Sequence, residues 1–357
     1  MPVVTTPTAL VATWRDGLFV VGGETSAQEL VHQSVRGLAF DGHGGALAIV
    51  NGRSLRRRAP DGVWSTVATT EFNLACCRAV GEVIYVGTDD ARVLRVDAEG
   101  EVEQLRGFDQ VAGRDTWYAG SAVINGQRVG PPLGIRSITA TPDGAVLLAN
   151  VHVGGVLRST DGGATWQPTI DVDSDVHEVR AHPNRPGVVM AAAAIGLCTS
   201  HDGGLTWDVE QEGLHASYCS AIAFAGDDVL VSASLDHFAA QGAIYRRPVD
   251  GHGPLVAVAG GLPKWIDGIA DNWLDCHARL RSRDRRSERQ PVLSRRHRPQ
   301  LVAPGRRPPI PEQRPHRLSA SGRYCVRARL AQVLDLLEAT VLSAGFDNSI
   351  GRRQVDG

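Results

Sequence analysis

The sequence predicts an all-β fold built from repeated four-stranded units, and three observations predict it. One eight-residue stretch occurs twice, as STDGGATW at 159–166 and as SHDGGLTW at 200–207. Short runs rich in apolar and β-branched residues, separated by turn residues, precede each copy, as expected for strands. Fainter copies of the same pattern lie upstream and downstream. Self-similarity at a spacing of about forty residues is typical of repeat architectures.

Both copies of the stretch read Ser-x-Asp-x-Gly-x-Thr-Trp, and this pattern predicts a turn between two strands. The Asp accepts backbone N–H bonds and caps the turn. Glycine permits a positive φ, while Thr and Trp begin the next strand and pack on its neighbour. The residues of the two motifs are Ser159, Asp161, Gly163, Thr165 and Trp166 in the first, and Ser200, Asp202, Gly204, Thr206 and Trp207 in the second.

The motif resembles the BNR or Asp-box repeat of sialidase-like β-propellers. It is also similar to repeats of the photosystem II stability factor type and of the broad WD40/YVTN/BNR-like group. The resemblance implies a β-propeller in which the box joins the third and fourth strands of a blade on the outer rim. It also implies a structural role, so the ten motif residues are not expected to be catalytic.

The repeat pattern divides the chain into five full blades and three further N-terminal strands. The expected blades cover 35–68, 71–106, 134–170, 175–211 and 217–260. The runs ALVATW, GLFVVGG and ELVHQ precede them and lack an inner partner strand. We therefore expect a parent ring of seven blades in which the two chain ends share the last blade and the sixth blade is lost.

Composition sets outer limits on the function. The chain has 357 residues, a net charge of −2 and 43% hydrophobic residues, which argues against a globally basic nucleic-acid binder. No apolar run reaches the roughly 18 residues of a membrane helix, and no signal peptide is recognised, so we expect a cytoplasmic protein without membrane contact. The six cysteines form no C-x-x-C pair and are expected to be reduced thiols.

The pattern of strands stops at about residue 276. Residues 277–318 contain thirteen arginines and seven prolines. One interpretation is a disordered basic tail. Nucleic acid would be a partner only if this tail is part of the genuine protein sequence. The other is a frameshift, which makes 1–276 the incomplete propeller and 277–357 an aberrant tail with an accidental helix near 327–344.

The frameshift interpretation rests on a permitted choice of codons. The codons GAA CGG CAA CCT GTA CTC TCG would encode Glu288 to Ser294, ERQPVLS, and the same bases shifted by one read Asn-Gly-Asn-Leu-Tyr-Ser. Permitted codons for the following RRHRPQLVAPGRRPP, shifted likewise, read Arg-Asp-Gly-Thr-Gly-His-Ser-Trp-Ser-Arg-Leu-Ala-Asp-Gly-Leu-Pro. This is a lengthened third box where the sixth blade requires one. A propeller without that blade exposes sheet edges, so we expect the 357-residue chain to be unstable or prone to aggregation.

The architecture implied by the resemblance places ligands on the face opposite the boxes. Two sets of loops form that face: those that lead into the innermost strands and those that join the second and third strands. Alignment of the inner strands places Arg36, Arg136 and His177 at one equivalent position near the mouth of the central channel. The other ligand-binding candidates are Trp117, Tyr118, Tyr218, His152, Asp236 and His237. The same loops also contain Asp89, Asp90, Asp171, Asp173, Asp175, His215, Trp265 and Asp267.

No metal or other cofactor is expected. His152, His177 and His237 together with Asp236 have side chains that suit several metals. Nothing in their spacing fixes their mutual distances. The acidic stretch DVDSD at 171–175 lacks the spacing of a calcium loop.

Two functional classes remain open. The favoured one is a non-catalytic propeller that binds an unknown protein or a carbohydrate-like ligand, because fold alone does not confer chemistry. The alternative is a sialidase-like or xyloglucanase-like glycoside hydrolase. The sequence has no Phe/Tyr-Arg-Ile-Pro motif, and only Arg36 and Arg136 stand at equivalent positions, although Asp236 and Asp267 would be the carboxylates of a xyloglucanase-like pair.

Overall fold

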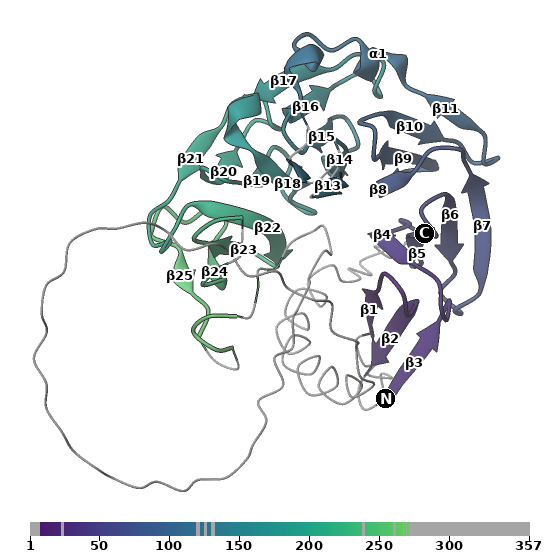
Figure 1. The fold of residues 1–357 in the computed structure, drawn as a ribbon, viewed down its shortest axis with the longest axis horizontal. Coiled ribbons are helices and arrows are strands. Elements are labelled where there is room, and N and C mark those ends of the chain that lie inside the picture. The colour runs from purple at the N-terminus through teal and green to yellow at the C-terminus, as the bar shows by residue number, and fades with distance from the viewer. Residues whose placement is uncertain are drawn as a thin grey trace, which may run out of the picture.

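The computed structural model is an all-β propeller whose sheets surround a common centre (Figure 1). It describes residues 8–270, apart from 23–24, 119–121, 125–126, 130–132, 238–239, 260–261, 267 and 269. The expected tail at 277–357, its helix near 327–344, Asp267, Cys276 and Cys325 lie outside the described residues.

Within the described residues, six sheets of three or four strands follow one another along the chain, and neighbouring strands pair antiparallel in chain order. The first sheet contains β1 (Thr8–Ala12), β2 (Leu18–Gly22) and β3 (Thr25–Glu29). The second contains β4 (Val35–Phe40), β5 (Ala46–Val50), β6 (Ser54–Arg58) and β7 (Trp64–Thr69). The third contains β8 (Leu74–Val80), β9 (Val83–Thr88), β10 (Val93–Val96) and β11 (Val102–Gln104).

The remaining three sheets have the same four-stranded form. The fourth contains β14 (Ile135–Ala140), β15 (Leu147–Val151), β16 (Gly155–Ser159) and β17 (Gln167–Ile170). The fifth contains β18 (Val176–Ala181), β19 (Val189–Ala193), β20 (Gly196–Ser200) and β21 (Asp208–Glu210). The sixth contains β22 (Tyr218–Ala225), β23 (Asp228–Ser234), β24 (Ala243–Pro248) and β25 (Val256–Ala257).

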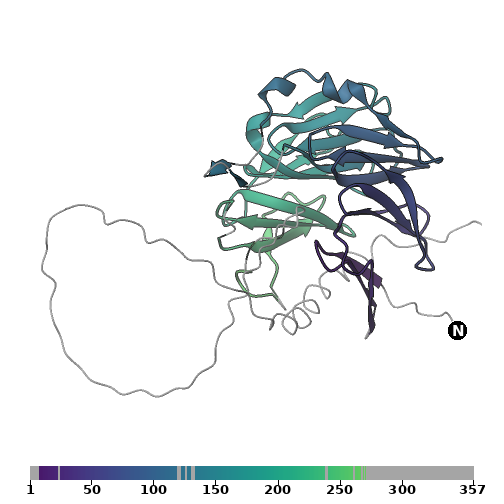
Figure 2. The ribbon, with the colours of Figure 1, turned by 45° about the vertical axis from the view of Figure 1, so that its right-hand side comes forward.

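A long connection between the third and fourth sheets contains the described helices α1 (Arg106–Asp109) and η1 (Arg114–Thr116) and the hairpin β12 (Ala122–Ile124) with β13 (Gln127–Val129). A second 3-10 turn, η2 (Val172–Ser174), leads into β18. Figure 2 shows the β12–β13 hairpin standing out from one face of the ring. This long insertion therefore includes a separate two-stranded unit.

The propeller with four-stranded blades is confirmed, but the blade arrangement differs from the expectation. The described residues form six blades. The expectation was five full blades plus three strands of a seventh blade that closes the ring. The N-terminal strands do not lack an inner strand, because β1 itself takes the inner position, packs beside β4 and lines the central cavity. Leu18, Val35, Ala48 and Val50 are fully buried between these first two sheets and fix this arrangement. The sequence pattern alone did not reveal which of the three strands was innermost.

The second strands of the second, fourth and fifth sheets are buried on both of their faces, since a neighbouring blade packs on either side. β5, β15 and β19 are buried throughout their length. This explains why ALAIV, LLANV and VMAAA are nearly continuous apolar runs without polar alternation. The packing of blade on blade forms the core of the molecule.

The two Ser-x-Asp-x-Gly-x-Thr-Trp motifs join the third and fourth strands of neighbouring blades, between β16 and β17 and between β20 and β21. Asp161 Oδ1 accepts the Thr165 N–H at 2.9 Å, and its Oδ2 accepts the Thr165 hydroxyl at 2.6 Å. Asp202 makes the same two bonds to Thr206, at 2.9 and 2.6 Å. The hydrogen bonds from the Thr165 side chain and backbone lower the pKa of Asp161 to about 2. The predicted capping of the turn by Asp is therefore present in both motifs.

Two further expectations concern single features of the chain. Cys76, Cys77, Cys198 and Cys219 are free and buried, in accordance with reduced core thiols, and burial raises the pKa of Cys77 to about 12. Within the described residues, no helix has the length and apolar character needed to span a bilayer.

Candidate functional site

The inner strands carry a β-bulge near their first residues, and the bulge recurs from blade to blade. In β14 the register shifts between Ile135 and Ser137, which leaves Arg136 as the extra residue. In β18 it shifts between Val176 and Glu178, which leaves His177 as the extra residue. A bulge bends its strand and redirects a side chain. The two predicted site residues therefore occupy the same special backbone position in adjacent blades.

Arg36 lies at a related position in β4, where the register shifts directly after it, between Arg36 and Ala39. Its guanidinium is 3.2 Å from Asp89 Oδ2 of the neighbouring blade and 5.4 Å from the centre of the Trp14 ring. Burial raises the pKa of Asp89, and the charge of Arg36 offsets only part of that rise. Arg36 thus pairs with a neighbouring blade's carboxylate at the mouth of the channel.

His152, Asp175 and His177 come together from two adjacent blades. His152 follows β15, and Asp175 and His177 flank the start of β18. Asp175 Oδ1 is 3.8 Å from His152 Nε2, and its Oδ2 is 3.5 Å from His177 Nε2. Only 6% of His152 and 1% of His177 are exposed. Two buried imidazoles and one partly exposed carboxylate therefore lie together.

The electrostatics of this group follow from burial and from Arg136. Burial, the charge of Arg136 and that of His177 lower the pKa of His152 to about 3, against the opposing pull of Asp175. Burial raises the pKa of Asp175, but the hydrogen bond and charge of His177 and the charges of His152 and Arg136 outweigh it, so the net shift is downward. At neutral pH the group therefore contains an ionised carboxylate and a neutral His152.

Tyr218 closes one side of the group. Its ring centre is 4.7 Å from that of His177, and it begins β22 of the next blade. His177 Nδ1 is 2.6 Å from the Cys219 carbonyl oxygen. The first residues of β22 thus fix the orientation of the His177 ring from its far side.

The central cavity opens beside these residues and has a volume of about 590 Å³. The side chains that line it include four arginines, namely Arg36, Arg78, Arg136 and Arg180. Glu178 is the one carboxylate among the described lining residues, and it is buried. It accepts the Ile222 N–H at 2.8 Å and the Arg180 Nε–H at 2.7 Å. The described lining residues of the cavity therefore include more positive than negative side chains.

Arg78 shows that the arginines of this wall are not all held in ion pairs. Within the described part of the chain, Arg78 makes no ion pair with a carboxylate. Burial and the nearby charge of Arg180 lower its pKa. A partly buried guanidinium facing a second guanidinium is a ready partner for an anion.

Trp117 and Tyr118 belong to the long insertion, and they lie differently. The Trp117 ring packs on Phe108 at 5.7 Å and lies under the Arg114 guanidinium at 4.8 Å. Tyr118 is 56% exposed, and its N–H donates to the Val153 carbonyl next to His152, at 3.2 Å. The structure thus places Trp117 in the core of the insertion and Tyr118 on the surface beside the histidine group.

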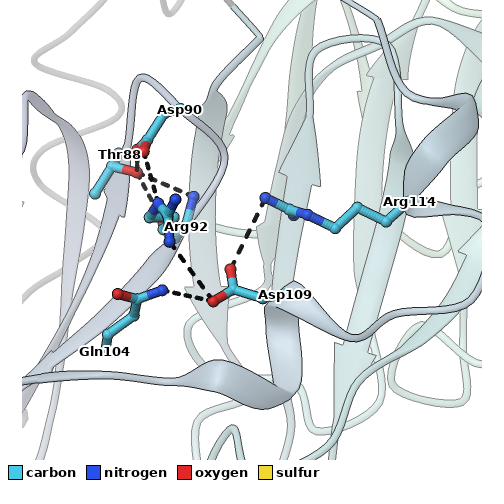
Figure 3. Close-up of polar contacts among 6 residues, drawn as sticks. All are labelled: Thr88, Asp90, Arg92, Gln104, Asp109 and Arg114. Carbon is cyan, nitrogen blue, oxygen red and sulfur yellow. Dashed lines mark hydrogen bonds and ion pairs between the residues drawn. The ribbon is translucent and has the colours of Figure 1, made fainter.

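A polar network supports this insertion (Figure 3). Asp109 accepts the Gln104 amide at 2.5 Å and lies 3.8 Å from both Arg92 and Arg114. Asp90, a loop carboxylate singled out in the sequence, accepts the Thr88 hydroxyl at 2.5 Å and the Arg92 Nε–H at 2.6 Å. Burial raises the pKa of Asp90, but these hydrogen bonds outweigh it and lower the pKa. Asp90 is thus engaged within its own loop.

Asp236 and His237 follow β23 and do not belong to the histidine group among the described residues. The candidate metal-binding group contains Asp175 beside His152 and His177, in place of the expected Asp236 and His237. Sequence reasoning missed Arg78, Arg180 and Glu178. Their signal was present in the inner-strand runs CRAV and VHEVRA, where charged residues interrupt otherwise apolar strands.

Comparison with known proteins supports the fold. No protein-family model and no curated protein sequence matches this chain. Among solved structures, YCF48 bound to a D1 peptide has a TM-score of 0.48 and 14% identity, covering 72% of this chain and 83% of that one. An ancestral GH74 enzyme has a TM-score of 0.50 and 15% identity, covering 73% of this chain and 33% of that one. At these identities the likeness extends to the propeller fold alone.

Proposed function

We propose that this chain is a non-catalytic binding propeller whose central cavity takes an anionic segment of a partner protein. The observation that carries the proposal is Arg78, a partly buried guanidinium without a carboxylate partner in the described cavity wall. A cavity of about 590 Å³ lies within the range of ligand sites. Arginine is well suited to such a site because its planar fork binds carboxylates bidentately.

The carboxylates of the cavity favour binding over glycoside hydrolysis. Retaining and inverting glycosidases use two carboxyl groups, about 5–5.5 Å or about 6.5–9.5 Å apart. The described lining supplies one, Glu178, whose oxygens already accept bonds from Arg180 and from the Ile222 N–H. Such a carboxylate is held as part of the framework.

The test is a titration of a fluorescent glutamate peptide with the full chain, followed by anisotropy. We expect Arg78→Gln to weaken binding by at least about tenfold, because truncating a desolvated charge contact costs 2–5 kcal/mol. Arg246→Gln is the matched control, since Arg246 is exposed and pairs with Asp228 on the outer part of its blade. Equal affinity in the wild type and in Arg78→Gln would overturn the proposal, as would equal binding of a matched glutamine peptide.

The alternative class, a sialidase-like or xyloglucanase-like hydrolase, has its own test. Fluorogenic glycosides assayed with the wild-type chain would report turnover. Activity that is abolished by Arg136→Ala or Asp236→Ala would replace the binding proposal with a catalytic one.

We also propose that the turn motifs are Asp-boxes of the BNR type and that the chain leaves its parent reading frame after about residue 276. Resequencing the codons for Asp275 to Leu318 tests the second point. One missing or extra base would show that the residues after about 276 are out of frame, whereas an intact frame would leave a genuine basic tail. A monodisperse 357-residue chain with a cooperative melt would contradict the expected loss of stability.

The buried free thiols fit a reducing compartment, and we propose the cytoplasm.

A further inference from the structure

We propose that His152, Asp175 and His177 form a binding site for a divalent transition metal, with Zn²⁺ as the best match. Imidazole nitrogens and a carboxylate oxygen are ligands that Zn²⁺ prefers. One atom from each residue can be chosen so that all three lie within 4.8 Å of one another. This site is independent of the anion-binding proposal and uses different side chains.

The distances suit a shared ion. Tetrahedral zinc with bonds of about 2.0–2.2 Å separates neighbouring ligand atoms by roughly 3.3 Å. The Asp175 oxygens lie 3.5 Å from His177 Nε2 and 3.8 Å from His152 Nε2. Small side-chain rotations would therefore bring the three donors to bonding distance. A fourth position remains for a water or another ligand, as in zinc sites with three protein ligands.

His177 is oriented as a metal ligand. Its Nδ1 is 2.6 Å from the Cys219 carbonyl oxygen, a contact that requires the proton on Nδ1. Its Nε2 lies 3.5 Å from Asp175 Oδ2, so the ring nitrogen that faces the carboxylate is the one that would bind the ion. A backbone carbonyl that holds the distal nitrogen is the usual outer partner of a metal-bound histidine.

His152 supplies a second, independent observation. It is 94% buried, and its Nδ1 is without a hydrogen-bond partner among the described residues. Its Nε2 is 3.8 Å from the Asp175 carboxylate, beyond hydrogen-bonding distance. A buried imidazole without hydrogen bonds is costly, and an ion shared with Asp175 would give its Nε2 a partner.

Asp175 is placed from two sides. It has a left-handed backbone with φ of 46°, which Asp tolerates better than most residues. Its carbonyl accepts the Ala194 N–H at 3.0 Å. The carboxylate is therefore held between the two histidines by the backbone and does not reach them from a flexible loop.

Arg136 is the charge that opposes a cation here, since it acts on both His152 and Asp175. A bound Zn²⁺ beside Asp175 and Arg136 leaves an excess of positive charge. We therefore expect Arg136→Gln to tighten metal binding. The same variant would weaken glutamate-peptide binding in the neighbouring cavity, so the two proposals predict opposite changes.

The experiment titrates the chelator-treated full chain with Co²⁺, followed by its visible absorption, and then with Zn²⁺ in competition. We expect one bound ion per chain and a rise in melting temperature with metal. His177→Gln and Asp175→Asn should weaken Zn²⁺ binding by at least about a hundredfold, more than the 10–100-fold typical of outer partners. His182→Gln is the matched control, because His182 is buried just after the same strand and also contacts a carbonyl.

Three outcomes would overturn the proposal. The first is no saturable metal binding by the wild-type chain. The second is binding that His177→Gln and Asp175→Asn leave unchanged, since the ion would then lie elsewhere. The third is equal loss in His182→Gln, which would mean that folding and not ligation was measured. Circular dichroism of each variant identifies any that fails to fold. If His177→Gln fails to fold, the more conservative Asp175→Asn and Arg136→Gln carry the test.

Discussion

The two ends of the blades differ in which side chains occupy their repeated positions. At the outer turns, the fourth and fifth blades repeat the same residues, and Asp161 and Asp202 make the same hydrogen bonds. At the channel mouth, the same bulged backbone position carries Arg136 in one blade and His177 in the next. Repeated side chains with internally satisfied bonds indicate a scaffold. Different side chains on a repeated backbone indicate a site.

The largest effect on stability is expected from removing the tryptophans of the two turns. Trp166 is 6% exposed, packs edge-on against Phe108 at 5.2 Å and donates to the Gly163 carbonyl. Trp166→Ala should lower the free energy of unfolding by about 3–5 kcal/mol. Trp207 is only half-buried and donates to Thr169 of the preceding blade at 3.2 Å, so Trp207→Ala should cost roughly half as much.

Urea denaturation of the two variants measures this difference. Equal losses would mean that the motifs are energetically interchangeable and that packing against the long insertion adds nothing. A loss below about 1 kcal/mol for Trp166→Ala would contradict a structural role for the first turn.

The carboxylates of the turns give the next largest effect. Asp202→Ala removes bonds from the Thr206 hydroxyl and from two backbone N–H groups, and should cost about 1–2 kcal/mol. Anion binding and metal binding should be unchanged. A change in either affinity, with the fold intact, would weaken the division between scaffold and site.

The dependence of stability on acidic pH also reports on the turn carboxylates. The folded pKa of Asp161 is about 2, below its ordinary value of 3.8, so its contribution is present above pH 4 and is lost as the pH falls through 2. Asp161→Asn should therefore destabilise the chain at neutral pH and flatten the loss of stability between about pH 4 and 2. Melting temperatures across that range, compared with the wild type, measure the change. A parallel curve would show that Asp161 is not the titrating group.

The smallest expected effect comes from Asp90, a loop carboxylate on the channel side. It pairs with Arg92 at 2.6 Å, and both side chains are exposed by more than a third (Figure 3). Asp90→Asn should change the free energy of unfolding by less than about 1 kcal/mol, as for other surface pairs. A larger loss would mean that the network around Asp109 depends on Asp90.

The sequence was informative where structure is decided locally. The turn motifs were predictable because Asp161 and Asp202 bond to residues four positions away. The place of β1 was not, because it depends on packing against β4 of the next blade. The grouping of His152 with Asp175 and His177 was not predicted either, since it joins loops of two blades and requires the bulge in β18.

The most direct test of the central claim is one binding series with the glutamate peptide on four chains. These are the wild type, Arg78→Gln, Arg136→Gln and Asp202→Ala. We expect both arginine variants to lose at least about tenfold in affinity and Asp202→Ala to bind like the wild type. Loss of affinity in Asp202→Ala alone, or equal affinity in all four folded chains, would contradict the assignment of the channel mouth as the site and the outer turns as the scaffold.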